Sequence, residues 1–218
     1  MKFFDDSTKK VQWWNRNYFF IGTIIIVLLN IILFAVGKNN WTPYLQKNSW
    51  GDIFNFHNIW VYFLNAFEHA NWQHCLLNML CFFVAGTYIE RKIGSLNLLS
   101  IVFLFAFFAD AVIGANYRGG FHGFSGVNYA LYGFVIIDYL FSFRKKVRNK
   151  TNIIYGGIVL GLIYLAMCYN GGTTGFGFDW YPYDLMTNMA HYSGLLAGVI
   201  MSLVIKICKI QGEKIKGS

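Results

Sequence analysis

The stretch from Tyr18 to Val36 reads YFFIGTIIIVLLNIILFAV and contains no charged residue. An α-helix needs about 20 largely apolar residues to cross the hydrocarbon core of a bilayer. The stretch is too long for the apolar region of a signal peptide and lacks a convincing cleavage site of small residues. We therefore expect it to be retained as a transmembrane helix.

The composition of the whole chain favours the same environment. Of its 218 residues, 56% are hydrophobic and only 13% are charged, whereas soluble domains are usually about 25% charged. The length suits a single domain. The four cysteines lie in apolar stretches without CxxC spacing, which indicates buried thiols rather than a disulfide framework or a zinc site. We expect no metal and no cofactor.

Five further apolar segments are candidates to span the membrane. They are, approximately, His74–Ile89, Leu96–Ile113, Ser125–Phe143, Ile153–Tyr169 and Leu185–Ile207. The sequence therefore predicts an all-α, polytopic membrane protein with six transmembrane helices. Its expected parts are an N-terminal segment at residues 1–17, a membrane domain at 18–207 and a basic tail at 208–218.

The positive charges predict how these helices are oriented. Lysine and arginine gather in the N-terminal segment, in the turn after the second helix, in FRKKVRNK at residues 143–150 and in the C-terminal tail. Cationic loops stay on the cytoplasmic side of a membrane, so both termini are expected to be cytoplasmic. The formal net charge of +8 is thus explained by topology and by contact with anionic lipid headgroups. We expect no nucleic-acid partner.

Two of the outward-facing connections have a distinctive composition. The first, Gly37–Gln73, is rich in tryptophan. Indole rings favour the membrane interface, so this segment is expected to lie on or dip into the outer leaflet. The last, GGTTGFGFDWYPY at residues 171–183, is rich in glycine and is not expected to hold one conformation by itself.

Three polar clusters interrupt the apolar helices. The first lies in EHANWQHCLLNML at residues 68–80, with His69, His74 and Asn78; the second is GFSG at 123–126, with Ser125; the third is AHYSGLLAG at 190–198, with His191. Polar groups inside a membrane are costly and usually face protein or water. Because the second, fourth and sixth helices all run from outside to inside, the three clusters are expected at one depth near the outer surface.

The clusters contain the groups that acyl transfer requires. A serine hydroxyl is a weak nucleophile without an adjacent base, and His191 is available as the base for Ser125. A tetrahedral intermediate also needs fixed hydrogen-bond donors for its oxyanion. Asn78, His74 and the backbone N–H of Ser125, at the N-terminus of a helix, are plausible donors.

Each signal alone also has a structural explanation. A lone serine or histidine in a transmembrane helix commonly serves packing, and the GxxxG formed by Gly194 and Gly198 commonly marks a helix contact. From the residues alone, serine catalysis and a structural or transport site both stay open. A zinc metalloprotease would need HExxH, which the sequence lacks. An aspartyl protease would need two aspartates that meet, whereas Asp110 and Asp138 are expected in opposite halves of the membrane.

At this point the residues resemble a known family, the rhomboid intramembrane serine proteases, across roughly Trp60–Leu203. HANWQHCLLNML resembles the family's His-x4-His-x3-Asn pattern. GFSGVNYALYGF resembles its Gly-x-Ser-Gly block followed by Tyr-Ala-x-x-Gly, and AHYSGLLAG resembles its Ala-His-x-x-Gly-x-x-x-Gly. The six-helix topology with both termini inside is also that of the family's basic bacterial form.

The resemblance implies a role for each matching position. Ser125 would be the nucleophile and His191 the general base of a dyad that uses no aspartate. The supporting residues would be His74, Asn78 and the Ser125 amide in the oxyanion hole, Gly123 leaving room for that hole, Tyr129 stacking on His191, and Glu90 as a structural glutamate at the cytoplasmic end of the second helix. His69 begins the first motif.

The resemblance also implies a function. The chain would be an intramembrane serine endopeptidase that cleaves transmembrane segments of other proteins near their outer ends. Because the sequence shows neither organelle targeting nor extra domains, we expect it in a bacterial inner membrane. The 171–183 loop would cap the site, and the fifth helix would be a lateral gate for substrate. The alternative is a non-proteolytic membrane protein that binds transmembrane segments, or a small transporter. The natural substrate and the oligomeric state stay open.

The sequence departs from the family pattern in a few places. Trp60–Val61 stands where the family often has Trp-Arg, so one charged anchor of the first connection is missing. His122, Asp110 and Asp138 match no family position. We expect the two aspartates to form hydrogen bonds between helices.

Overall fold

The computed structural model of the chain describes residues 20–37, 61–69, 71–116, 123–144, 154, 156–162, 164–165 and 185–216. Every regular element in these ranges is a helix, which confirms the predicted all-α class. The elements are α1 (Ile21–Gly37), α4 (Val61–Leu64), the 3-10 helix η1 (Asn65–Phe67), α5 (Trp72–Ile93), α6 (Ser95–Asn116), α7 (Ser125–Arg144) and α9 (Leu185–Lys216). The described residues of the predicted fifth helix, between 154 and 165, are helical too.

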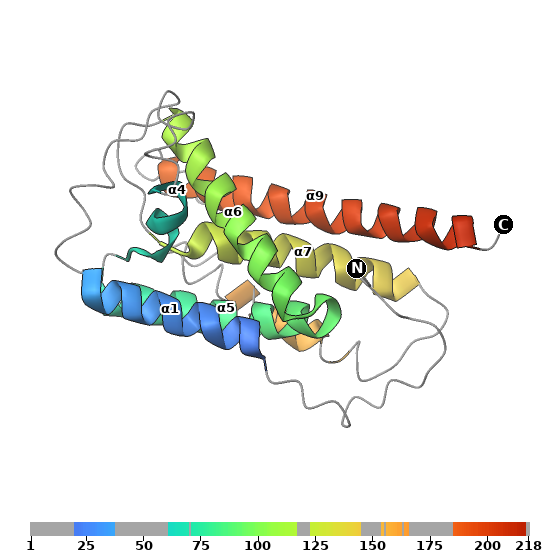
Figure 1. Cartoon of the computed structure of the whole chain (residues 1–218), viewed down its shortest axis with the longest axis horizontal. Coiled ribbons are helices and arrows are strands. Elements are labelled where there is room, and N and C mark those ends of the chain that lie inside the picture. Colours follow the sequence, from blue (N-terminus) through green and yellow to red (C-terminus); the bar gives the residue numbers. More distant parts are fainter. Residues whose placement is uncertain are drawn as a thin grey trace.

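Helix α7 is the central element of the bundle. It packs lengthwise against α9 and also contacts α5 and α6, while α1 lies along α5 and α6 crosses the bundle (Figure 1). All residues from 123 to 135 are buried. A helix that is apolar on all sides belongs in an interior, which explains why α7 is enclosed by its neighbours.

The helix ends follow local chemistry that hydropathy does not register. Helix α5 begins at an N-cap, where the side chain of Asn71 accepts a hydrogen bond from the backbone N–H of His74 at 2.8 Å. It ends at Gly94, whose φ of 83° suits glycine. Helix α9 continues to Lys216, well past the predicted end at Ile207, because KIQGEKIK is polar yet contains good helix formers.

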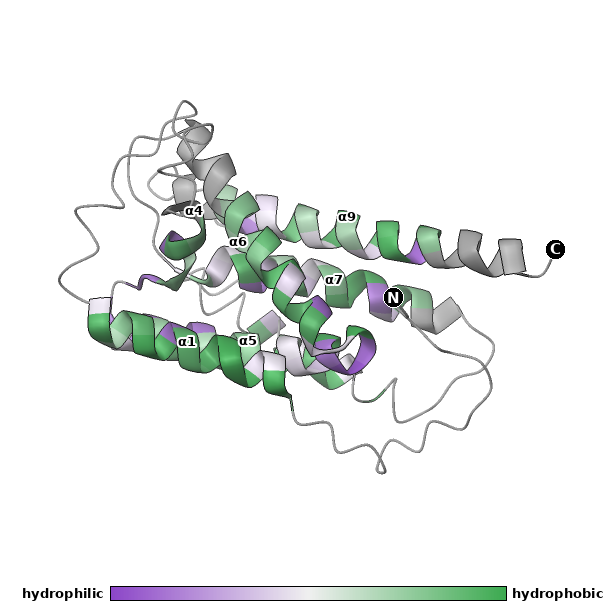
Figure 2. Cartoon of the chain, in the orientation of Figure 1, coloured by the Kyte–Doolittle hydropathy of each residue, from purple (hydrophilic) through white to green (hydrophobic). Residues whose placement is uncertain are grey.

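The apolar surface of the helices agrees with a membrane protein. Most of the coloured helical residues in Figure 2 are hydrophobic, and many large apolar side chains are exposed, among them Ile32 of α1 and Ile200 of α9. Within the described residues, Met189–Cys208 has both the length and the apolar composition of a membrane span, and Ile21–Gly37 and Ser95–Ala109 are shorter apolar helices. The count of six spans and the cytoplasmic location of both termini stay predictions.

Glycines allow α7 and α9 to pack backbone against backbone. A Cβ atom added to Gly198 would collide with the carbonyl oxygen of Ala130, and one added to Gly194 would collide with that of Gly126. From the other side, a Cβ on Gly133 would collide with the carbonyl oxygen of Leu195. The GxxxG of the last helix is therefore a helix contact, and it brings the segment after His191 directly against the segment after Ser125.

A buried carboxylate joins α1 to the far end of α5. Glu90 accepts hydrogen bonds from the backbone N–H groups of Gly22 and Thr23, at 2.8 and 2.9 Å, and from the hydroxyls of Thr23 and Ser95. The first N–H groups of a helix have no partner within it and carry its positive dipole end. Glu90 thus satisfies backbone N–H groups at the start of α1.

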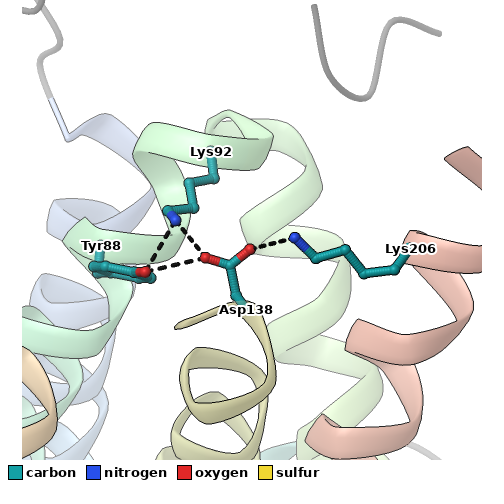
Figure 3. Close-up of polar contacts among 4 residues, drawn as sticks. All are labelled: Tyr88, Lys92, Asp138 and Lys206. Carbon is teal, nitrogen blue, oxygen red and sulfur yellow. Dashed lines mark hydrogen bonds and ion pairs between the residues drawn. The ribbon is translucent and has the colours of Figure 1, made fainter. Parts of the chain in front are cut away.

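Asp138 forms a second network at the same end of the bundle (Figure 3). Its carboxylate pairs with Lys92 of α5 and, at 2.6 Å, with Lys206 of α9, and it accepts a hydrogen bond from the hydroxyl of Tyr88 at 3.0 Å. Hydrogen bonding between helices was expected for Asp138; the two ion pairs are an addition. Sequence reasoning used both lysines only as markers of topology.

Some predicted features lie outside the described residues. They are His122, the first connection before residue 61, the 171–183 loop and the side chain of Asp110.

Candidate active site

Ser125 is the first residue of α7, directly after a sharp bend in the chain. Gly123 makes this bend with a φ of 135°, a conformation that residues with a side chain rarely adopt. A Cβ atom at Gly123 would lie 2.8 Å from Cε1 of His74. The missing side chain therefore lets the His74 ring approach the backbone just before Ser125.

His191 of α9 lies against the same face of α7. Its ring stacks on the ring of Tyr129, with the centroids 4.0 Å apart and the planes within 2° of parallel. Tyr129 follows Ser125 by four residues, so the two share one face of the helix, one turn apart. Ser125 and His191 are both buried, with 5% and 7% of their surface exposed.

The close α7–α9 contact continues up to these two residues. A Cβ atom at Gly126 would lie 3.7 Å from the carbonyl oxygen of Ala190, which precedes His191. The backbone at Gly126 and the backbone at Ala190 are thus separated by little more than the space of a methyl group. The structure brings the predicted nucleophile and the predicted base to the same level of one helix pair.

His69 holds the segment that leads into α7. Its Nε2 accepts a hydrogen bond from the backbone N–H of Phe124 at 3.4 Å, and its Nδ1 lies 3.2 Å from the carbonyl oxygen of Phe67. These partners fit a neutral ring that carries its proton on Nδ1. Burial, together with the nearby His74, lowers the pKa of His69 from 6.5 to about 4. His69 is therefore neutral at pH 7 and acts as a support for the bend.

His74 and Asn78 lie one turn apart on α5. The His69 and His74 rings meet edge to face with their centroids 5.2 Å apart. The side-chain Nδ2 of Asn78 donates to the carbonyl oxygen of His74 at 3.1 Å. The described part of α5 thus presents two hydrogen-bonding side chains on the side where α7 begins.

Sequence reasoning missed one residue of this site, Asn128. Its Nδ2 donates to both the carbonyl oxygen and the side-chain Oδ1 of Asn78, at 3.0 Å each. The available signal was an asparagine within an apolar span, since polar groups there usually have a specific partner.

The predicted site residues divide into two groups. The first group lies around the start of α7 and consists of His69, His74, Asn78, Gly123, Ser125, Tyr129 and His191. Gly194 and Gly198 line the helix contact beyond them, and Glu90 lies at the other end of α5. Within the described ranges, no three or more His, Cys, Asp or Glu side chains form a group suited to a metal ion.

Comparison with known proteins identifies the family of this chain. A family model described as the rhomboid domain matches residues 57–207. The chain belongs to the rhomboid family. The resemblance noted in the sequence is thereby confirmed, and rhomboids are helical, integral membrane proteins.

Relatives of this rhomboid include two curated bacterial proteins. The rhomboid protease GlpG of Salmonella paratyphi A is 30% identical over 149 residues, which are 67% of this chain and 48% of that protein. The rhomboid protease GlpG of Salmonella newport is 32% identical over 149 residues, with the same coverage. The chain thus spans about half the length of the curated relatives that it matches.

Proposed function

We propose that this rhomboid is an intramembrane serine endopeptidase that cleaves transmembrane segments of other membrane proteins near their outer ends. One observation carries the proposal. The Tyr129 ring stacks on His191 one helical turn from Ser125, so the imidazole is held over the face of α7 that bears the serine. The curated relatives, which are named rhomboid proteases, support the same activity.

The proposed reaction begins at Ser125. Its Oγ attacks the carbonyl carbon of the scissile peptide bond while His191 accepts the hydroxyl proton. His191 then donates this proton to the leaving amine, and the peptide C–N bond breaks to give an acyl-enzyme. Water attacks the ester in the second half, again with His191 as base, and the protonated imidazole returns the proton to Oγ of Ser125 as the ester C–O bond breaks.

The oxyanion would be stabilised by donors from two helices. The N–H of Ser125 lies in the first turn of α7, where backbone N–H groups have no partner in a preceding turn and the positive end of the helix dipole acts. His74 and Asn78 of α5 would supply the side-chain donors. Preorganised donors of this kind commonly contribute the largest single part of the rate enhancement.

The location of the cut follows from the predicted topology. The three polar clusters belong to helices that are expected to run from outside to inside, so the site would open to the outer side of the membrane. Deacylation consumes water, which would reach Ser125 from that side. The substrates would be helices whose backbone leaves the helical conformation near its outer end, because bond attack needs an accessible carbonyl.

The test is cleavage of a transmembrane reporter by the purified full chain in liposomes. We expect Ser125→Ala to abolish cleavage and labelling by a fluorophosphonate probe. Ser202→Ala is the matched control, since Ser202 is a fully buried serine of α9 that lies well beyond His191 along the helix. Equal cleavage by the wild type and Ser125→Ala would refute the proposal and favour a protein that binds or transports without proteolysis.

A further inference from the structure

Asn128 connects the helix of the proposed nucleophile to the helix of the proposed oxyanion donors. It is 2% exposed and lies three residues after Ser125 on α7. Its Nδ2 lies 3.0 Å from the backbone oxygen and 3.0 Å from the side-chain Oδ1 of Asn78 on α5. One amide NH2 group has two N–H donors, and here both are directed at a single residue of the neighbouring helix.

The chemistry of these contacts fixes the orientation of both amides. If the Asn128 amide were rotated by half a turn, its oxygen would face two acceptors. If the Asn78 amide were rotated, its oxygen would face the carbonyl oxygen of His74, which now accepts from Nδ2 at 3.1 Å. The observed arrangement leaves Oδ1 of Asn128 buried without a hydrogen-bond partner, but it keeps three donor–acceptor contacts. Each rotated alternative replaces such contacts with acceptor against acceptor, which is costlier in a buried site. Each asparagine therefore holds the other in one orientation.

This orientation determines what Asn78 presents to a substrate. The Oδ1 of Asn78 is occupied by Asn128, and one N–H of its Nδ2 is occupied by His74. None of the hydrogen bonds in the described residues uses the second N–H. An oxyanion needs a donor at this position, whereas a rotated amide would present a lone pair and repel the negative charge.

We infer that Asn128 is a positioning residue of the oxyanion hole, which holds the Asn78 amide so that an N–H rather than an oxygen is available to the oxyanion. The inference rests on the proposed function. Asn128 itself touches no reacting atom. Residues that orient a functional group by hydrogen bonding commonly change activity by about 10- to 100-fold when removed, as the outer-shell partners of metal ligands show.

Two variants of Asn128 separate positioning from packing. Asn128→Leu keeps the size and removes the donors; Asn128→Asp keeps the shape and places a carboxylate against Oδ1 of Asn78. In the full chain in liposomes, we expect kcat for a transmembrane reporter to fall about tenfold or more in Asn128→Leu and further in Asn128→Asp. The KM is expected to stay within about twofold, because the donor acts in the transition state. The rate of fluorophosphonate labelling should fall in parallel.

A double-mutant cycle with Asn78 gives the decisive result. Asn78→Ala alone should lower kcat by about 100-fold or more, as expected for an oxyanion donor. Adding Asn128→Leu should then cause no more than about a twofold further loss, since its target is gone. Asn30→Leu is the matched control: Asn30 is a fully buried asparagine of α1 whose Nδ2 bonds within its own helix. It should leave kcat unchanged.

Several results would overturn the inference. The first is a wild-type kcat in Asn128→Leu. The second is that Asn128→Leu lowers kcat by the same factor with and without Asn78→Ala. The third is that Asn30→Leu lowers kcat as much as Asn128→Leu does. If the leucine variant does not fold, the isosteric Asn128→Asp carries the test, and a wild-type kcat there is equally decisive. An inactive Ser125→Ala with fully active Asn128 variants would remove this inference alone, whereas an active Ser125→Ala would remove the proposed function itself.

Discussion

A single methyl group at position 123 tests the geometry at the start of α7. Gly123→Ala would place its Cβ 2.8 Å from Cε1 of His74, whereas ordinary carbon contacts begin at about 3.5 Å. The His74 ring would therefore move by roughly half an ångström or more. The φ of 135° adds backbone strain of about 1–3 kcal/mol for a residue with a side chain.

The expected consequence is a loss of both activity and stability. Functional groups must be held within about 0.5 Å of their productive positions, and a displacement of about 1 Å commonly costs about 100-fold in rate. We expect Gly123→Ala to lower kcat for a transmembrane reporter by about 10- to 100-fold. The free energy of unfolding in detergent should fall by about 1–3 kcal/mol.

Gly94→Ala is the control that separates strain from collision. Gly94 also has a positive φ, of 83°, but a Cβ atom there would meet nothing within 4 Å. This variant should lose a similar free energy of unfolding and keep its kcat. If Gly123→Ala retains as much activity as Gly94→Ala, the close approach of His74 to this bend is not needed for function, and the reasoning fails.

The Asp138 ion pairs and the buried His69 give two further predictions. Asp138→Asn would leave Lys92 and Lys206 without the carboxylate that joins them, so we expect the free energy of unfolding to fall by about 3 kcal/mol. Adding Lys206→Met should recover part of this loss. An unchanged free energy of unfolding in Asp138→Asn alone would contradict a stabilising role of the ion pairs. His69 has a pKa of about 4 in the folded chain against 6.5 ordinarily, so the unfolded chain takes up the proton first as the pH falls. Its contribution, about 3 kcal/mol, is complete above pH 6.5 and lost between pH 6.5 and 4, which chemical unfolding of the wild type and His69→Gln at several pH values would measure. If the free energy of unfolding depends on pH equally in the wild type and in His69→Gln, the pKa of His69 is not lowered by folding.

The positions of the helices could be predicted because hydropathy reports how well a segment suits the apolar interior of a membrane. The predicted second, third and fourth helices, His74–Ile89, Leu96–Ile113 and Ser125–Phe143, correspond to α5, α6 and α7 with ends shifted by a few residues. The shifts arise from caps such as Asn71, and from helix formers that continue after the apolar run has ended, as in α9. Hydropathy therefore predicts where the apolar part of a helix begins and ends, whereas the helix itself can extend beyond that part.

The partners of polar groups could not be predicted in the same way. Asp138 pairs with residues 46 and 68 positions away in the chain, and Asn128 bonds to a residue 50 positions away. These pairs depend on the rotation and depth of one helix against another, which no local pattern encodes. Motifs such as GFSG and AHYSG could indicate the candidate site because their residue types are characteristic, whereas Asn128 stands between GFSG and YALYG at a position that the motif does not specify.

The burial of α7 has a consequence for how the bilayer influences this protein. From Ser125 to Val135 every residue of α7 is enclosed by protein, so acyl chains do not contact the segment that carries the proposed nucleophile. Exposed apolar side chains instead lie on the surrounding helices, for example Leu28 of α1 and Ile200 of α9. A change in bilayer thickness or lipid composition would therefore reach Ser125 only as a tilt or shift of its neighbours. The backbone contacts at Gly194 and Gly198 make α9 the helix whose movement Ser125 would follow most closely.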